Sequence, residues 1–394
     1  MNTSINGIVD AAPLSPIRKI SDLVASFPDA VNLTVGQTDL PTPEIIQEAA
    51  IRAIPSCAGY TANMGTLELR RAYADFVGKR YGIHYDTDEV IVTNGATSAL
   101  DIALRVILEP GDEIILSAPV YPGYLLPVAM CQATPVFVDT TNSHFVMTAE
   151  LIEQHITPKT KCILLSYPSN PTGKVMKKDE LEKIAAVMRK HPEIYILSDD
   201  IYSELSFTGE PHACIAVYPE LKKQTIVVQS LSKSHSMAGW RIGFLLAEKE
   251  LMVNMLKLQQ IAAISASSVG QAAALEALRS CDDELERRIG VYVERRDYVY
   301  DRLVGMGLEV EKPEGAFYIF PSIRTLGGKP LSISSFDLAM RLAENQHLGV
   351  VPGSGFSEYG EGYIRISYAA SMDTLKEGMD RLEKELKEIP KEIL

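Results

Sequence analysis

The sequence predicts an α/β protein: a large layered domain in which helices cover both faces of a mostly parallel sheet, followed by a smaller α+β domain. Short, strongly apolar runs recur between residues 89 and 247, and helical patterns lie between several of them. Runs that are apolar throughout are typical of strands buried on both faces of a parallel sheet. After about residue 282 the pattern changes to long charged helices and a few isolated strand-like segments.

The apolar runs number seven, so we expect a seven-stranded sheet. They are EVIVTNG (89–95), EIILSAP (113–119), TPVFVDT (134–140), KCILLSYPSN (161–170), YILSDD (195–200), TIVVQSLSK (225–233) and RIGFLLA (241–247). The spacing of apolar residues predicts helices over 98–108 and 178–189, each between two of these strands. Strands that alternate with helices are the pattern of an α/β domain with helices on both faces of its sheet.

The C-terminal part begins with a long predicted helix, which Gly305 and Gly307 should end. Two strand-like segments follow, FYIF and YIRISYA, and then a closing helix that we expect Asp373 to cap. The apolar stripes on both helices are most simply packing faces. We therefore expect a smaller α+β domain here and assign its helices no chemistry.

Charge and cysteine usage exclude several classes of partner. Lys and Arg total 38 against 51 Asp and Glu, a formal net charge of -13, and such a surface repels the phosphates of nucleic acids and anionic lipids. The five cysteines form no CxxC pair, which indicates reduced thiols and no metal site. No apolar run approaches the length of a signal region or a membrane span. We expect a cytoplasmic protein with no nucleic-acid partner and no membrane partner.

The strongest candidate for chemistry is SLSKSHSMAGWRIG (230–243), at the end of the sixth apolar run. Lys233 follows a strand end among hydroxyls and small residues, where partial burial lowers the pKa of a lysine and leaves the neutral amine that can attack a carbonyl. Arg241 offers a planar fork for a phosphate, and Ser230 and Ser232 offer hydroxyl donors. The same pattern, taken alone, also fits a solvated loop.

A second candidate, TNGATSAL (93–100), lies between a predicted strand and the start of a helix. Gly95 lets the backbone approach a ligand closely, and the amides at the helix start, with the hydroxyl of Thr97, form a site for an anion. An ordinary strand-to-helix turn would give the same pattern. The glycine-rich segment GSGFSEYGEG (353–362) does not match dinucleotide-binding spacing, so we interpret it as a turn near the site.

Two further polar segments also follow predicted strands. Asp199 is costly to bury unless it meets a cation, so it could pair with a protonated ring nitrogen while Tyr202 gives its hydroxyl to the same ligand. Capping of a following helix by Asp199 or Asp200 is the other interpretation. Asn170, in YPSNPTG, can hydrogen-bond a ring oxygen, with Pro171 fixing the turn, in cis or in trans; a plain loop also fits.

Together, and in this order, these motifs resemble the class I (fold type I) aminotransferases that depend on pyridoxal phosphate. The resemblance runs from VGQTDLPTP (35–43) to YIRISYA (363–369). SLSKSHSMAGWRIGF, YPSNPTG and GAFYIFPS are most similar to the bacillary branch of aromatic and N-acetyl-LL-diaminopimelate aminotransferases. The resemblance implies pyridoxal 5′-phosphate as cofactor. It also implies an N-terminal segment (1–44) that joins the small domain, a large cofactor-binding domain (45–285) and a small domain (286–394).

The resemblance implies a role for each residue that would hold the cofactor. Lys233 would bind the cofactor covalently and shuttle the proton, and Asp199 would keep the pyridine nitrogen protonated. The phenolate oxygen of the ring would receive hydrogen bonds from Asn170 and Tyr202, with Tyr121 stacked on the ring face. The phosphate would lie in a cup formed by Gly95, Ala96, Thr97, Ser230, Ser232 and Arg241.

The same resemblance implies how substrate and partner are held. Arg365 would clamp the α-carboxylate of an amino acid or a 2-oxo acid, with Gly36 and Asn170 beside it. Tyr60 would reach the phosphate bound by a partner subunit, which implies a homodimer with shared active sites. Asp200 stands where this branch more often has glutamate, and we expect it to face away from the site. The sequence shows no second arginine dedicated to a side-chain carboxylate, which disfavours an aspartate-type substrate.

We therefore expect an aminotransferase that works by a ping-pong mechanism. Its amino donor would be an aromatic amino acid or N-acetyl-LL-diaminopimelate, with glutamate and 2-oxoglutarate as the partner pair. Two alternatives use nearly the same residues: a C–S β-lyase dependent on pyridoxal phosphate, and a non-catalytic regulator that binds the cofactor. Regulators of the second kind carry an added DNA-binding domain and a basic arm, and the sequence shows neither.

Overall fold

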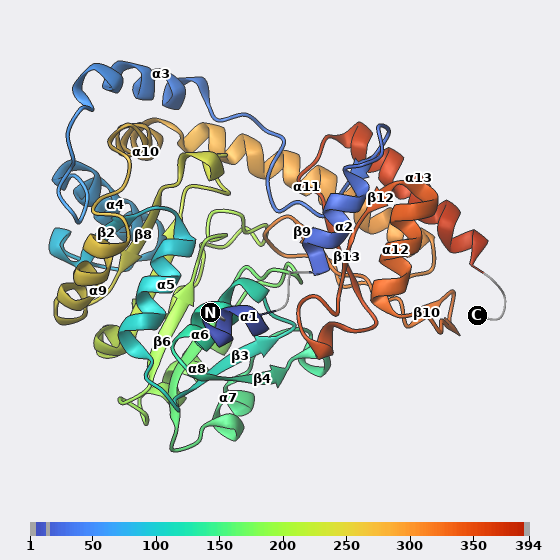
Figure 1. The fold of residues 1–394 in the computed structure, drawn as a ribbon, viewed down its shortest axis with the longest axis horizontal. Helices are drawn as coiled ribbons and strands as arrows, with labels where there is room; N and C mark the ends of the chain where they lie inside the picture. The colour runs from blue at the N-terminus through green and yellow to red at the C-terminus, as the bar shows by residue number, and fades with distance from the viewer. Residues whose placement is uncertain (1–4, 13–15, 390–394) are drawn as a thin grey trace, which may run out of the picture.

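The computed structural model describes residues 5–12 and 16–389 of the 394-residue chain. Its centre is a seven-stranded sheet in the order β2–β8–β7–β6–β5–β3–β4 (Figure 1). The strands, one for each apolar run, are β2 (Val90–Thr93), β3 (Glu113–Ala118), β4 (Thr134–Asp139), β5 (Thr160–Leu165), β6 (Tyr195–Asp199), β7 (Thr225–Ser230) and β8 (Gly243–Leu246). β8 runs antiparallel to β2 and β7, and the other pairs in this sheet are parallel. The predicted α/β fold with a mostly parallel seven-stranded sheet is confirmed.

Successive side chains of each strand enter cores on opposite faces of the sheet. Ile226 and Val228 of β7 pack into one core and Val227 into the other, as do Leu197 and Ile196 of β6. The first face is covered by α5 (Ala96–Ile107), α6 (Leu125–Met130) and α9 (Lys249–Ala262). The opposite face is covered by α4 (Leu67–Tyr81), α7 (Ala149–His155), α8 (Lys178–Met188) and α10 (Ser268–Ser280). Burial on both faces explains why the strands are apolar throughout.

The C-terminal part of the chain packs around a core of its own. A three-stranded antiparallel sheet in the order β13–β14–β9 lies within it, and a β-hairpin and three helices complete it. These elements are β9 (Tyr318–Ile319), β10 (Thr325–Leu326), β11 (Lys329–Pro330), β13 (Val351–Pro352), β14 (Ile364–Ser367), α11 (Asp282–Gly305), α12 (Ser335–Gln346) and α13 (Met372–Glu388). Figure 1 shows the long α11 running from α10 toward these C-terminal elements.

Near its N-terminus the chain joins this second core rather than the large sheet. β1 (Val31–Asn32) pairs with β12 (Leu348–Gly349), and α2 (Pro16–Val24) lies beside α12 (Figure 1). The short α1 (Gly7–Ala11) packs on α6, and α3 (Glu44–Ala53) packs on α10. The domain limits after residues 44 and 285 stay predictions; the second of them falls inside the continuous helix α11.

The helix ends follow the expected capping chemistry with one correction. α11 begins at Asp282 and ends at Gly305, close to the predicted limits. The predicted cap of the last helix at Asp373 is wrong, because Ser371 caps α13: its Oγ accepts a hydrogen bond from the amide of Thr374 at 3.2 Å. A cap must precede the first helical residue to reach that amide, and Asp373 already lies in the first turn. None of the described helices is long and apolar enough to cross a membrane.

Candidate active site

A cavity of about 1150 Å³ lies between one edge of the large sheet and the C-terminal part. The parallel strands end at this edge, and the antiparallel β8 begins there, so the loops at these strand ends meet around one space. Of the predicted site residues, those lining the cavity are Gly36, Ala96, Thr97, Tyr121, Asn170, Asp199, Tyr202, Ser230, Ser232, Lys233, Arg241 and Arg365. Residues separated by more than 300 positions in the sequence are thus brought together.

The two remaining predicted residues lie outside the lining. Gly95 has a φ of +81° and stands directly behind Arg241, since a Cβ at this position would come within 2.5 Å of the Nη2 atom of that guanidinium. Its lack of a side chain is what lets Arg241 approach the start of α5. Tyr60 is 83% exposed on the surface of the single chain, so its role toward a partner subunit stays a prediction.

Asp199 is the buried carboxylate at the end of β6, only 1% exposed. Its Oδ2 accepts a hydrogen bond of 2.5 Å from the hydroxyl of Tyr124, and its Oδ1 accepts one of 3.4 Å from the amide of Ile201. Burial raises the pKa of Asp199 to about 6, and the bond from Tyr124 works in the opposite direction. The carboxylate therefore faces the cavity at a position where a cationic ligand group would stabilise it.

Asp200 faces away from the cavity, as expected. Its Oδ1 accepts a hydrogen bond of 2.7 Å from Ser198 Oγ, and its Oδ2 lies 3.2 Å from Nε2 of the buried His212. In the described chain a run of turns, not a helix, follows β6, so the interpretation of these aspartates as helix caps is wrong.

Lys233 lies in the short loop between β7 and β8, and a strap formed by residues 36–42 holds this loop. The Nζ of Lys233 donates a hydrogen bond of 2.6 Å to the carbonyl of Gly36. Thr42 Oγ1 donates to the carbonyl of Ser236 at 2.7 Å and accepts from Trp240 Nε1 at 3.1 Å. The strap and the loop are far apart in the sequence, yet together they fix where the amine lies.

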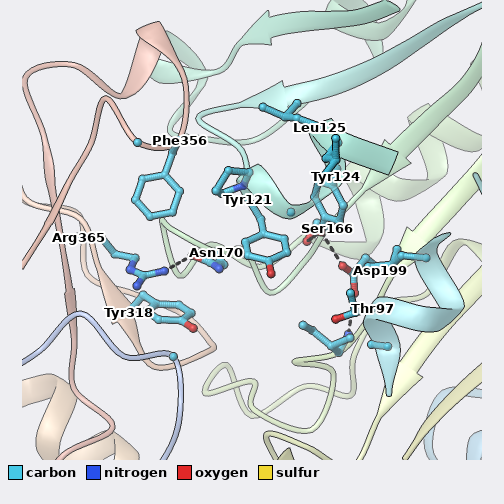
Figure 2. A pocket seen from close by; sticks show the side chains of 18 of the residues that line it. Thr97, Tyr121, Tyr124, Leu125, Ser166, Asn170, Asp199, Tyr318, Phe356 and Arg365 are labelled. Atoms are coloured by element: carbon cyan, nitrogen blue, oxygen red, sulfur yellow. Dashed lines mark hydrogen bonds between the residues drawn. The ribbon is translucent and has the colours of Figure 1, made fainter. Parts of the chain in front are cut away.

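Arg365, on β14, is buried and enters the cavity from the side opposite to the large sheet (Figure 2). Its Nη1 donates to Asn170 Oδ1 at 2.9 Å, and its Nη2 donates to the carbonyl of Thr34 at 2.5 Å. Its Nε is buried and has no hydrogen-bond partner among the described residues. Because Asn170 uses its oxygen toward Arg365, the donor it can offer to a ligand is its Nδ2 group.

The serines at the end of β7 divide their roles. Ser230 Oγ donates a hydrogen bond of 2.8 Å to the carbonyl of Ile242 and lies 2.7 Å from Ser232 Oγ. Because Ser230 gives its one proton to that carbonyl, Ser232 is the donor in the bond between the two hydroxyls, and its proton reaches a bound anion only by turning away from Ser230. Arg241, at the far end of the loop, donates to the carbonyls of Ala238 and Asn94, which holds its guanidinium beside the start of α5.

Several residues of the site were missed in the sequence. Tyr318 and Phe356 lie on the Arg365 guanidinium, with ring centroids 4.4 and 5.1 Å from Cζ, and Tyr318 shares a hydrogen bond of 2.8 Å with Tyr202. Tyr124 contacts Asp199. The glycine-rich segment around Phe356 was expected near the site, but FYIF and the second tyrosine of YPGY carried no signal beyond strand and turn.

The comparison with known proteins agrees with this arrangement. Residues 28–382 match the family described as aminotransferase class I and II. The chain belongs to this family. A probable N-acetyl-LL-diaminopimelate aminotransferase of Bacillus subtilis (strain 168) is 51% identical over 94% of this chain and 92% of its own length. The aromatic-amino-acid aminotransferase 2 of Thermococcus litoralis is 36% identical over 95% and 96% of the two chains. A crystal structure of the aspartate aminotransferase from Rhizobium meliloti has a TM-score of 0.92 at 34% identity, covering 98% of this chain and 99% of that one.

The protein is therefore an aminotransferase that uses pyridoxal phosphate and acts on amino acids and 2-oxo acids. Two observations in the aminotransferase structure fit the cofactor. Because Gly95 has no side chain, the Arg241 guanidinium lies directly against the start of α5, and this pairing of a cation with a helix start suits a phosphate. Across the cavity, the buried Asp199 carboxylate accepts a hydrogen bond from a hydroxyl but forms no ion pair among the described residues. A protonated ring nitrogen would supply the missing positive charge.

Proposed function

We propose that this aminotransferase moves the α-amino group of N-acetyl-LL-diaminopimelate to 2-oxoglutarate by a ping-pong mechanism. The observation that carries the proposal is the distribution of charge in the cavity. Its described lining holds three cationic side chains, Lys233, Arg241 and Arg365. The first two are needed for the cofactor, so one guanidinium remains, and it suits the α-carboxylate that every amino donor has.

The rest of the cavity wall favours an amino donor with a long side chain that carries no carboxylate close to the reacting carbon. Beyond Tyr121, the lining continues over apolar residues of α1 and α6, among them Ile8, Leu125, Leu126 and Ala129. The second carboxylate of aspartate would lie against this wall with no cation to pair with. The methylene chain of N-acetyl-LL-diaminopimelate would contact these apolar residues. Its distal carboxylate and acetamido group would then lie beyond them. The 51% identity to a relative described by this substrate supports the same choice.

An aromatic amino acid is the second candidate donor, and the rings around Arg365 favour it. Phe356 and Tyr121 both line the cavity next to the guanidinium, where they would contact an aromatic side chain edge to face or stacked. A C–S β-lyase is not favoured, because the family and the relatives above are described as aminotransferases.

The positions described above support the following role for each residue. Arg365 binds the α-carboxylate through its Nε and a terminal N–H group of the guanidinium. Gly36 and Asn170 lie beside it. Bound pyridoxal phosphate supplies an electron-withdrawing ring that takes up the electron pair left on the α-carbon. Lys233 holds the cofactor and then moves the α-proton through its Nζ, as base and as acid. Asp199 keeps the ring nitrogen protonated.

The remaining roles concern binding alone. Asn170 Nδ2 and the Tyr202 hydroxyl donate to the ring oxygen, and Tyr121 covers one ring face. The phosphate is held by Gly95, Ala96, Thr97, Ser232 and Arg241, with Ser230 orienting Ser232. Their common effect is to fix the ring so that the amine of Lys233 stays within reach of the substrate.

We propose, in addition, that the enzyme is a cytoplasmic homodimer with shared active sites. The five cysteines are free thiols, which suits a reducing compartment. The exposed ring of Tyr60 suits contact with a partner. Lys233→Ala and Tyr60→Ala variants, each inactive alone, should regain about a quarter of the parent activity when their subunits are mixed and reassociated. A mixture that stays inactive, or a monomer in solution, would overturn this.

The substrate is tested by single-turnover spectroscopy of the holoenzyme. The absorbance of the bound cofactor is followed after mixing with N-acetyl-LL-diaminopimelate, phenylalanine, glutamate or aspartate. We expect the rate constant divided by the dissociation constant to be about a hundredfold higher for N-acetyl-LL-diaminopimelate than for aspartate, because an unpaired carboxylate costs several kcal/mol. Phenylalanine as the fastest donor would support the second candidate, and aspartate as the fastest would refute both.

A further inference from the structure

Tyr124 lies at the end of the short 3₁₀ turn Pro122–Tyr124, between the sheet and the cavity, and nothing in the roles above uses it. It is 1% exposed, and its hydroxyl donates to Asp199 Oδ2 at 2.5 Å. The same oxygen lies 3.1 Å from Ser166 Oγ. The phenol has a single proton, and the shorter contact gives it to the Asp199 carboxylate rather than to Ser166.

This contact decides how Asp199 is presented to the cavity. Oδ2 is bound to Tyr124 and Oδ1 only weakly to a backbone amide, so rotation of the carboxylate would break its stronger bond. Figure 2 shows the Tyr124 hydroxyl pointing at Asp199 from the side of Ser166, with Thr97 on the opposite side of the carboxylate.

The other titratable and charged groups facing Asp199 come from three elements. Asp200 and Tyr202 follow it on its own strand end, Lys233 lies on the loop after β7, and Tyr121 lies on the turn that also carries Tyr124. Asp200 disfavours the charge on Asp199, and Lys233 favours it. Burial favours the neutral form of Asp199 and raises its pKa. The hydrogen bond from the Tyr124 hydroxyl favours the charged form and lowers the pKa.

Tyr124 also supports the ring that should stack on the cofactor. The rings of Tyr121 and Tyr124 meet edge to face, with centroids 5.3 Å apart and planes at 87°. One buried side chain therefore contacts both the carboxylate and the aromatic ring that the proposed function assigns to the cofactor. Neither contact requires Tyr124 to touch the cofactor itself.

We propose that Tyr124 is a positioning residue that fixes the orientation of Asp199 and holds its carboxylate in the charged form needed to bind a protonated pyridine nitrogen. This rests on the role that the proposed function gives to Asp199. Tyr124 thus acts on the cofactor through Asp199, and its hydroxyl is the group that matters.

The test compares three variants with the parent: Tyr124→Phe, Asp199→Asn and the control Tyr368→Phe. Tyr368 is also fully buried, and its hydroxyl donates to the carbonyl of Ala316 at 3.3 Å, away from the cavity. The ligand is pyridoxamine 5′-phosphate, which carries the pyridine nitrogen and the phosphate but no carbonyl for Lys233. Binding to the apoprotein is followed by the fluorescence of Trp240, the single tryptophan of the chain.

We expect Tyr124→Phe to weaken binding about tenfold at neutral pH, the effect of losing one hydrogen bond to a charged group. Loss of the hydroxyl raises the pKa of Asp199, so the fall of affinity on acidification should begin at a higher pH than in the parent. Reconstituted with excess cofactor, the variant should lose kcat while the KM for the amino donor changes little. Tyr368→Phe should match the parent in every measurement.

The outcomes separate the proposal from the role on which it rests. Parent-like affinity and an unshifted pH profile for Tyr124→Phe, with weakened binding for Asp199→Asn, would overturn the role of Tyr124 and leave that of Asp199 standing. Parent-like binding by Asp199→Asn would overturn both. An equal loss of affinity in Tyr124→Phe and Tyr368→Phe would show a general packing effect and also overturn the proposal.

Discussion

At the scale of single residues, Arg365 joins the two halves of the site, because its guanidinium contacts Asn170 from the large sheet and Thr34 from the N-terminal segment. Two aromatic rings enclose it, so the planar fork is held in one orientation before any ligand arrives. A lysine would keep the charge but lose both the fork and the stacking.

Replacing Arg365 by lysine should therefore affect the substrate and spare the cofactor. We expect the KM for the amino donor to rise about 10- to 100-fold, the cost of one hydrogen bond to a charged group. The affinity for pyridoxal phosphate should change little. Steady-state kinetics and cofactor titration give the two numbers; an equal loss in both would contradict the assignment of this guanidinium to the substrate carboxylate.

Gly95 offers a sharper test of the phosphate cradle. A Cβ at Gly95 would displace the Arg241 guanidinium, so Gly95→Ala should weaken cofactor binding about tenfold or more, beyond the cost in folding stability of a side chain at positive φ. The matched control is Gly111→Ala, where φ is +95° but a Cβ would have nothing within 4 Å. Cofactor affinity is measured for both; a similar loss in Gly111→Ala would mean that backbone strain, and not the position of Arg241, is responsible.

At the residue scale, the sequence singles out charged side chains near strand ends, and their roles stay predictions. Lys233, Asp199 and Arg241 are such residues, and all three line the cavity. Tyr124 and Tyr318 were missed, because a tyrosine in an apolar or turn segment has the same appearance whether its hydroxyl contacts the site or the core. Only the packing of distant segments distinguishes the two cases.

At the scale of elements, the closing helix shows how a cap depends on one position. Ser371→Ala removes the acceptor for the amide of Thr374 and should lower the free energy of unfolding by about 1 kcal/mol. Asp373→Ala removes only a charge near the helix start and should cost about 0.5 kcal/mol. Urea unfolding of the two variants measures the difference, and the reverse order would reinstate Asp373 as the cap. Transamination should be unaffected in both.

The strands of the large sheet were predictable because each is buried on both faces and is apolar along its whole length. The direction of β8 was not predictable, because its sequence is as apolar as those of the parallel strands and carries no sign of direction. The small sheet was harder still. β9 and β13 are two residues long, too short for any periodicity, and their pairing is decided by contacts with β14.

At the scale of the whole molecule, two buried groups pull the pH dependence of stability in opposite directions. Burial lowers the pKa of His235 to about 4, below the value of about 6.5 in an unfolded chain. The unfolded chain therefore binds more protons between these values, and stability is lost as the pH falls through them. Burial raises the pKa of Asp199 to about 6; here the folded chain binds more protons between pH 6 and 4, and stability is gained as the pH falls.

The apoprotein of Asp199→Asn should consequently lose stability on acidification more steeply than the parent apoprotein. The expected difference accumulates between pH 6 and 4 and amounts to at most roughly 3 kcal/mol, since one pKa unit corresponds to about 1.4 kcal/mol. Urea unfolding at a series of pH values measures it. Parallel stability curves for the two apoproteins would show that the pKa of Asp199 is the same in the folded and the unfolded chain.

The antiparallel direction of β8 has one more consequence. Because the chain leaves β7 and enters β8 at the same edge, Lys233 and Arg241 lie on a single short loop, and under the proposed roles they would hold the cofactor at two separated points. Once one of these two residues has bound the cofactor, the other would act at a high effective concentration, as in a bivalent ligand. Release would then require both contacts to break together, so under these roles we expect the connection between the two strands to slow dissociation of the cofactor.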